Sequence, residues 1–262
     1  LKGDTVYASS RGRVTMLIDA NRDGVPEVVQ DIITGLPAGR HQTDGLAIGP
    51  DGKLYVGQGS VDDRGESGNS PPLQASILQA NLDGTGLRVY ARGLRNPYDL
   101  VFHPITARLF ATDNGRDTPS SGVPEELNYI VEGRHYGWPP CWGNGLGTNC
   151  AGTSSPVAIF QEHLSADGLW FYTGDKFPPE YKYNIFVALY GANANTPTVG
   201  RKVMRVELQD TIVTRVNEFA TGFLHPLDVT TGPDGALYVA DFGTGIVYRI
   251  TYAGITGIEL DA

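Results

Sequence analysis

The chain has 262 residues, which is long enough for one domain with a well-packed core. Its net charge of −9 opposes phosphate binding, because nucleic-acid binders need a clustered basic surface. The 34 glycines and 17 prolines are typical of many short strands joined by tight turns. We therefore expect a single all-β domain over residues 1–262 and no nucleic-acid partner.

No stretch of the sequence reaches the roughly 18 consecutive apolar residues that a membrane span requires. Residues 1–15 also lack the charged start and the apolar core of a signal peptide. We therefore expect a soluble chain without a membrane span, processed or trimmed at its start.

The first predicted strands are residues 4–9, 13–19 and 27–33, which resemble the outer three strands of a four-stranded unit whose innermost strand is absent. The loop DANRDG at residues 19–24 resembles the start of an oxygen-ligand calcium loop. Its twelfth position is Gln30 rather than glutamate, and no flanking helices are evident. We expect an inter-strand turn here, with a loop calcium as the alternative.

A strand, a short turn and a second strand recur further along the chain. Residues 44–56 read DGLAIGPDGKLYV, and residues 227–239 repeat this pattern as LDVTTGPDGALYV. Looser copies occupy residues 99–111 and 169–190. Further β-rich runs follow these hairpins, at residues 76–81, 88–91, 202–207, 214–219 and 246–251.

Two hairpins per repeat make a four-stranded blade, and copies spaced by ~45 to 70 residues predict a β-propeller. A β-sandwich is the alternative, although sandwiches do not repeat a strand-turn-strand sequence so literally. About five blades are visible, counting the partial one at the start. Either residues before Leu1 are missing, or the last segment closes a smaller ring.

The two cysteines, Cys141 and Cys150, lie in the loop CWGNGLGTNC, where no histidine or third cysteine offers a metal site. This context favours a local disulfide, and hence an oxidising compartment, either periplasmic or extracellular. Two reduced loop thiols are the alternative.

The loops before the first strand of each blade should open onto one face near the propeller axis. These loops are RHQTD at residues 40–44, GLRNPYD at 93–99 and GFLHPLD at 222–228. They predict one mouth, suited to a small polar ligand, that is lined by His41, Arg95, Asn96, His225 and Asp228.

Not every polar residue of these loops needs a functional role. For Asp44, Asp99 and Asp228 we favour hydrogen bonding to the backbone of the turns. His41 and Arg95 are too long and polar for simple turn capping, and a histidine that titrates near neutrality can serve as a base.

Five motifs in order along the chain resemble those of the glucose/sorbosone dehydrogenases. They begin at residues 41, 93, 112, 125 and 135 and read HQTDGLAIGPDG, GLRNP, TDNGRD, EELN and HYGWP. The combination is specific and spans most of the chain, whereas each motif alone is weak. The resemblance implies a six-bladed propeller that holds pyrroloquinoline quinone (PQQ) over a calcium ion at its axial mouth.

The same resemblance assigns roles to individual residues. His41 is implied as the base that acts on the anomeric hydroxyl of a sugar, while Arg95 and Asn96 contact the quinone. The backbone carbonyls of Gly115 and Arg116 are implied as calcium ligands.

A second calcium position is implied at Glu125, Glu126 and Tyr136, whose oxygen atoms suit calcium. The alternative is that the two glutamates only solvate a loop.

The chain departs from the family pattern in three places. The family has an Arg-x-Arg before the last inner strand, where this chain has His225-Pro-Leu, and it has a lysine on a middle blade. After the second strand the family often has Gly-Asp, where this chain has Gly59-Ser60. We assign His225 and Lys202 as cofactor contacts, with Arg201 as a further candidate to replace lost charge.

The sequence therefore predicts a sugar dehydrogenase that oxidises aldose-type sugars with PQQ and Ca²⁺. Its partners would be a small sugar substrate and an electron acceptor such as a cytochrome or a quinone. A non-catalytic propeller that binds calcium or carbohydrate is the first alternative, and a calcium-dependent lactonase or sugar hydrolase is the second.

Overall fold

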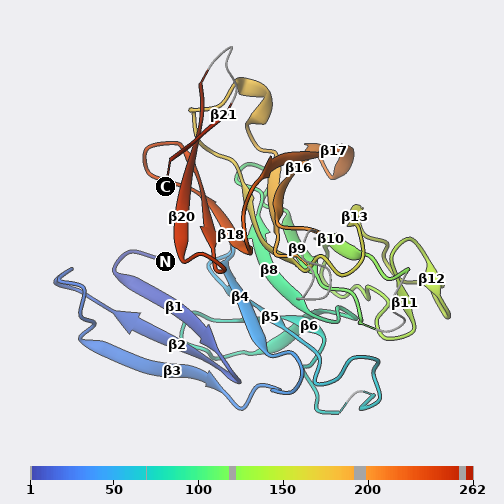
Figure 1. Ribbon diagram of the computed structural model, residues 1–262. Helices are drawn as coiled ribbons and strands as arrows, with labels where there is room; N and C mark the ends of the chain where they lie inside the picture. Colours follow the sequence, from blue (N-terminus) through green and yellow to red (C-terminus); the bar gives the residue numbers. More distant parts are fainter. Residues whose placement is uncertain (1, 69, 118–121, 192–198, 254–257, 262) are drawn as a thin grey trace. The chain divides into compact units, whose positions relative to one another are not determined.

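The chain is almost entirely β-structure. The computed structural model describes residues 2–68, 70–117, 122–191, 199–253 and 258–261. Within this part of the chain the only helix is a single 3₁₀ turn, η1 (Pro179–Tyr181), which begins directly after Pro178. Figure 1 shows the strands in chain order. The predicted all-β class is confirmed.

The structure groups the chain into two compact units. The first comprises residues 1–100, 116–118 and 130–155, and the second comprises 101–115, 119–129 and 156–262. Whether residues 1–262 behave as one domain stays a prediction.

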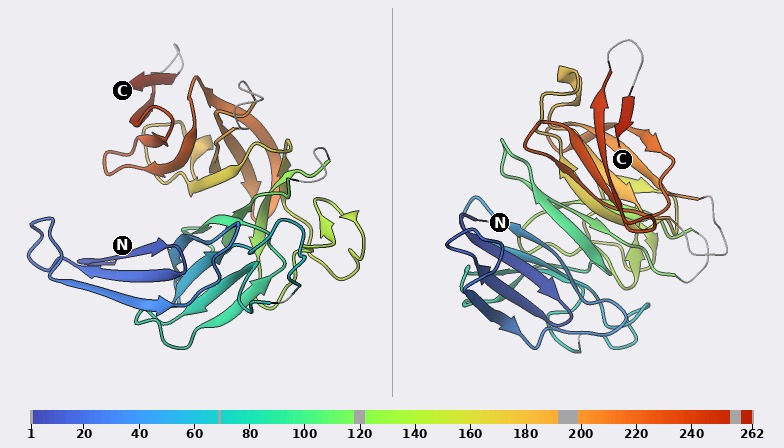
Figure 2. Two further views of the ribbon diagram at one scale, coloured as in Figure 1. Left: turned by 60° about the horizontal axis from the view of Figure 1, so that its bottom comes forward. Right: turned by 60° about the vertical axis from the view of Figure 1, so that its left-hand side comes forward.

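The first unit contains a three-stranded sheet, a four-stranded sheet and a small two-stranded ribbon. The three-stranded sheet, blue in Figure 2, is the partial unit expected at the start of the chain. The strands of this unit are β1 (Thr5–Ser10), β2 (Arg13–Ile18), β3 (Val28–Thr34), β4 (Thr43–Ile48), β5 (Leu54–Gln58), β6 (Ser76–Ala80), β7 (Arg88–Arg92), β11 (Cys141–Trp142) and β12 (Leu146–Gly147).

The second unit contains three four-stranded sheets, with strand orders β13-β10-β9-β8, β14-β15-β16-β17 and β18-β19-β20-β21. Strand β8 (Pro97–Phe102) begins in the first unit. The other strands are β9 (Leu109–Asp113), β10 (Glu125–Ile130), β13 (Ala158–Phe160), β14 (Ala166–Phe171), β15 (Ile185–Leu189), β16 (Lys202–Gln209), β17 (Ile212–Thr221), β18 (Pro226–Thr231), β19 (Leu237–Asp241), β20 (Ile246–Tyr252) and β21 (Ile258–Asp261).

Each four-stranded sheet begins with one of the predicted hairpins. In the first, Leu46 pairs with Val56 and Ile48 pairs with Leu54, so the GPDG segment forms the turn as expected. The other three hairpins are β8–β9, β14–β15 and β18–β19. The predicted four-stranded repeat is therefore confirmed, with about five blades visible when the three-stranded sheet is counted.

Each unit has its own hydrophobic core, because alternate strand residues face inward. In the first unit Val14, Leu54 and Leu78 are fully buried together. In the second unit two clusters form, one around Phe110 and one around Tyr172.

A close approach between first strands recurs in both units. A Cβ atom on Gly45 would lie 2.6 Å from Oδ1 of Asp99, and one on Gly168 would lie 2.3 Å from Oδ1 of Asp228. Both glycines lie where the pairing of their strand shifts register. Glycine at these positions therefore makes room for an aspartate of the next first strand.

Candidate functional site

His41 and Asn96 meet across Gly59 in the first unit. The backbone N–H of His41 donates to the carbonyl of Ser60 at 3.0 Å, which fixes the loop before β4. A Cβ atom on Gly59 would lie 2.4 Å from Cβ of His41 and 2.9 Å from Oδ1 of Asn96. The structure thus brings two predicted site residues together, and Gly59 is the residue that lets them approach.

The imidazole of His41 is neutral. Burial, followed by the charges of Arg95 and Arg40, lowers the pKa of His41 to about 3, against the opposing charges of Asp117 and Asp63. The Nε2 atom is buried and has no hydrogen-bond partner among the described residues. Because a buried polar atom normally has a partner, this atom fits a ligand that supplies one.

Arg95 is held by a carboxylate that the sequence reasoning missed. Its side chain is 4% exposed and donates to Oδ1 of Asp63 from Nε at 3.1 Å and from Nη2 at 2.7 Å. The same oxygen accepts the backbone N–H of Asp117 at 3.0 Å. The only sequence signal was an acidic pair, Asp62-Asp63, in a loop that resembles a solvated turn.

Three further arginines surround this ion pair. Arg64 lies 4.0 Å from Asp63, and Arg40 pairs with Asp117. The guanidinium of Arg116 lies 3.6 Å from the centre of the Trp142 ring. Burial, together with the charges of Arg64 and Arg95, lowers the pKa of Arg116.

This part of the first unit is densely charged. Four guanidinium groups lie near the carboxylates of Asp63 and Asp117, and the loop that carries Asp63 also holds Asp62 and Glu66. The arginines offer several donors that an anionic ligand could use.

The predicted calcium ligands of the second unit do not all converge. Glu125 and Glu126 are consecutive residues of β10, and their side chains leave opposite faces of the sheet. Glu125 accepts the backbone N–H of Gly115 at 3.0 Å, whereas Glu126 accepts from Asn128 at 3.0 Å. Both glutamates are at least 95% buried, so the alternative that they solvate a loop is wrong.

The hydroxyl group of Tyr136, in the first unit, accepts the backbone N–H of Val131 at 2.8 Å. Among the described residues no cluster of three or more His, Cys, Asp or Glu is arranged to hold a metal ion. Calcium ligation by Gly115, Arg116, Glu125, Glu126 and Tyr136 stays a prediction.

His225 lies in the loop before β18, as expected. Its ring stacks on Tyr190 with centroids 4.3 Å apart, and its Nδ1 lies 3.1 Å from the Tyr190 carbonyl oxygen. Its backbone N–H donates to Asp241 at 2.8 Å. Lys202 pairs instead with Glu218 on the adjacent strand β17 at 2.7 Å, so its charge is already compensated.

Two of the three first-strand aspartates, Asp99 and Asp228, bond to the backbone, as we favoured for them. Oδ1 of Asp99 accepts the N–H of Leu100, and Oδ1 of Asp228 accepts that of Val229. Burial raises the pKa of Asp44 to about 7, and it also raises the pKa of Asp228.

The start of β14 and the loop before it hold polar residues that the sequence reasoning did not single out. Asp167 accepts from Asn114 at 3.0 Å and from the Ser165 hydroxyl at 2.8 Å. Nε2 of His163 is buried without a hydrogen-bond partner in the described part of the chain. The repeat of Asp-Gly-Leu at residues 44–46 and 167–169 was the signal that could have found this loop.

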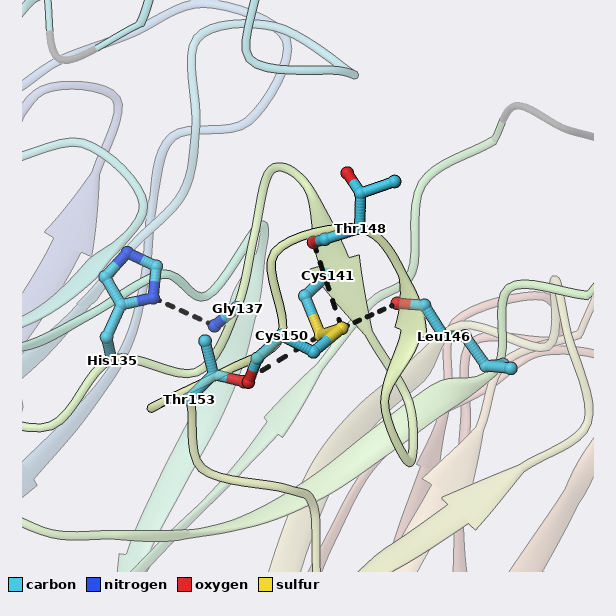
Figure 3. The surroundings of a disulfide bond; sticks show 7 residues. All are labelled: His135, Gly137, Cys141, Leu146, Thr148, Cys150 and Thr153. Carbon is cyan, nitrogen blue, oxygen red and sulfur yellow. Dashed lines mark hydrogen bonds between the residues drawn. A yellow bond between two sulfur atoms is a disulfide. The ribbon is translucent and has the colours of Figure 1, made fainter.

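The predicted disulfide between Cys141 and Cys150 is confirmed (Figure 3). It closes the loop that carries β11 and β12. The loop at residues 19–24 is an inter-strand turn, also as expected, in which the Asp19 carboxylate accepts the backbone N–H groups of Asp23 and Gly24. Within the described residues, no helix has the length and apolar character to cross a bilayer.

The protein-family model for glucose/sorbosone dehydrogenase matches residues 6–249. The aldose sugar dehydrogenase YliI of Escherichia coli K12 is 26% identical over 82% of this chain and 61% of its own length. The quinoprotein glucose dehydrogenase B of Acinetobacter calcoaceticus is also 26% identical, over 84% of this chain and 53% of its own. The chain spans between 53% and 61% of the length of the curated relatives that it matches.

Solved structures give the same result. The PQQ-bound aldose sugar dehydrogenase from Streptomyces coelicolor is 26% identical, with a TM-score of 0.72 over 98% of this chain and 75% of that one. The PQQ domain of pyranose dehydrogenase from Coprinopsis cinerea shares the fold at 17% identity, with a TM-score of 0.78 over 95% of this chain and 79% of that one. The fold is a β-propeller with four-stranded blades, and the chain belongs to the glucose/sorbosone dehydrogenase family.

Proposed function

We propose that this chain forms the catalytic propeller of an enzyme that oxidises aldose-type sugars with PQQ and Ca²⁺. The observation that carries the proposal is the buried Nε2 atom of His41, which is neutral and has no hydrogen-bond partner among the described residues. A neutral imidazole can accept a proton, and the arginines near it would offer donors to an anionic cofactor.

The residues of the first unit fit a quinone that carries carboxylates. The arginines around Arg95 would donate to those carboxylates, although residues 225–227 lack the Arg-x-Arg of the family pattern. Arg40, Arg64 and Arg116 are the cations that would compensate for that loss. Asn96 lies against His41 and would contact the quinone on the same side.

His41 would act as the base. Its Nε2 would accept the proton of the anomeric hydroxyl group, and the carboxylates of Asp63 and Asp117 would partly offset the burial and the arginine charges that disfavour the imidazolium. When bound, PQQ supplies the electrophile that takes up the hydride of the anomeric carbon. Arg95 would contact the quinone without reorienting, because the ion pair with Asp63 already holds its guanidinium in place.

The carbonyl groups of Gly115 and Arg116 would hold the calcium ion. Glu125 anchors this segment by accepting the Gly115 N–H at 3.0 Å, so its role would be positioning rather than ligation. Hard oxygen ligands of this kind suit calcium.

The comparisons support this proposal through relatives that are described as an aldose sugar dehydrogenase and a quinoprotein glucose dehydrogenase. We further infer a single six-bladed propeller in the complete protein, a sugar as substrate and a cytochrome or quinone as electron acceptor. The disulfide supports a periplasmic or secreted location, because disulfides persist in oxidising compartments.

A non-catalytic propeller that binds calcium or carbohydrate is the second candidate. The sequence His225-Pro-Leu at the Arg-x-Arg position favours it, since two cations of the family pattern are absent there. A calcium-dependent hydrolase has weaker support, because Asp99 and Asp228 are engaged with the backbone.

One titration separates these candidates. Calcium-loaded protein is titrated with PQQ, and a panel of aldoses is then added while the quinone absorbance and dye reduction are followed. The dehydrogenase predicts sugar-dependent reduction that His41→Gln abolishes with quinone binding retained. Gln42→Ala, an exposed neighbour, is the matched control and should keep activity. No binding of quinone at micromolar concentration, or quinone binding without turnover of any sugar, would favour the second candidate.

A further inference from the structure

A pocket lies within the first unit, between the segment before β6, strand β7 and the turn at residues 135–139. Its volume is about 380 Å³, which is in the range of pockets that hold small organic ligands. Most of its wall is apolar, formed by Pro71, Leu73, Val89, Trp138 and Pro139 among others. None of the residues to which we assign catalytic or cofactor-binding roles lines it.

Two of the residues that line this pocket, Arg92 and His135, can donate hydrogen bonds. Arg92 is exposed on β7, and it takes part in none of the ion pairs found among the described residues. Nδ1 of His135 accepts the backbone N–H of Gly137 at 3.0 Å (Figure 3). The proton of the neutral imidazole is therefore on Nε2, which leaves Nε2–H as a donor.

The pocket has a cationic group at its edge. Arg92, which is exposed, lines it together with His135. The carboxylate of Glu132, in the same segment as His135, is paired with Arg88.

We propose that this pocket binds a small carboxylic acid built on a single ring, with the carboxylate on Arg92 and His135 and the ring against Trp138 and Pro71. Arginine suits a carboxylate because its planar donors match the two oxygens. Tryptophan and proline faces suit the flat or C–H face of a ring. An aromatic acid and a sugar acid share this chemistry, and binding of either is independent of PQQ.

The test uses two probes, benzoate and glucuronate, each titrated into the intact protein without quinone at low salt and followed by calorimetry. Saturable binding of at least one probe is expected, and Arg92→Gln should weaken it by at least about tenfold because a charged hydrogen bond is lost. Arg134→Gln, an exposed arginine nearby that does not line the pocket, should leave the affinity unchanged.

A second readout is the indole resonance of Trp138 followed by NMR. A ring bound in the pocket should shift this resonance, and Arg92→Gln should remove the shift at the same probe concentration. Binding of benzoate alone would indicate an aromatic acid, and binding of glucuronate alone a sugar acid. No saturable binding of either probe, or binding that Arg92→Gln leaves intact, would overturn the proposal.

Discussion

Arg95 and Asp63 form a buried ion pair, with Nη2 of the arginine 2.7 Å from Oδ1 of the aspartate and side-chain exposures of 4% and 16%. Removing one partner of a buried pair leaves the other charge uncompensated, which costs about 3–5 kcal/mol. Asp117 lies 3.6 Å from Arg95 and would compensate part of that charge, so we expect Asp63→Ala to lower the free energy of unfolding in urea denaturation by an amount near the lower end of this range.

The matched control is Glu132→Gln, which breaks the exposed pair with Arg88. Exposed pairs contribute about 1 kcal/mol or less to stability. The free energy of unfolding of this variant should therefore be close to that of the wild type. The double variant Asp63→Ala with Arg95→Met should recover part of the loss, since no buried charge remains unpaired. Equal, small effects of the two single variants would contradict the buried-pair assignment.

His41 should make the protein less stable as the pH falls. Its pKa is about 3 in the folded state and near 6.5 in the unfolded state, so between these values only the unfolded chain takes up a proton. The folded state therefore loses up to about 2 kcal/mol of stability between pH 7 and pH 5. The free energy of unfolding of the wild type and of His41→Gln should be measured across this pH range. The wild type should lose more stability than the variant as the pH falls. An equal pH dependence of the two proteins would refute the assignment.

Asp44 should have the opposite pH dependence, because its pKa is raised to about 7 by burial. The contribution of the neutral acid is fully present below pH 3.8 and is lost as the pH rises toward 7. Asp44→Asn should therefore stabilise the protein by about 1–3 kcal/mol at pH 8 and have little effect near pH 3.5.

Asp234 is the control of opposite sign. Its hydrogen bond with Arg249 lowers the pKa of this carboxyl group, so Asp234→Asn should destabilise the folded protein at pH 8. If Asp234→Asn stabilised the protein at pH 8, or Asp44→Asn destabilised it, the direction of the pKa shift assigned to that carboxyl group would be wrong.

The disulfide should stabilise the protein by restricting the unfolded chain. Cys141 and Cys150 are nine residues apart, and a loop of this size is worth roughly 2–3 kcal/mol. The double variant Cys141→Ser, Cys150→Ser should have a free energy of unfolding that is lower by this amount. A reductant should lower the free energy of unfolding of the wild type to the same value. If the variant and the wild type unfold together without reductant, the bond contributes nothing.

Much of the architecture could be predicted because its signals are local. The GPDG turns at residues 49–52 and 232–235 set the hairpins, and alternation of apolar residues sets which face is buried. The disulfide was predictable for the same reason, since both cysteines lie on one short loop. The repeat further predicted that His41 and the Arg95-Asn96 pair would occupy equivalent loops, and in the first unit His41 and Asn96 do meet.

The sequence by itself thus determined the strands, the turns, the blade pattern and the candidates for the site. Only the tertiary structure decided how those candidates are charged and paired: Asp63 holds Arg95, Glu218 takes Lys202, and Glu125 and Glu126 leave opposite faces of β10. The physical reason is that a turn or a strand depends on neighbours in the chain. The pKa and the ion pairing of a side chain depend on burial and on charges supplied by segments distant in sequence.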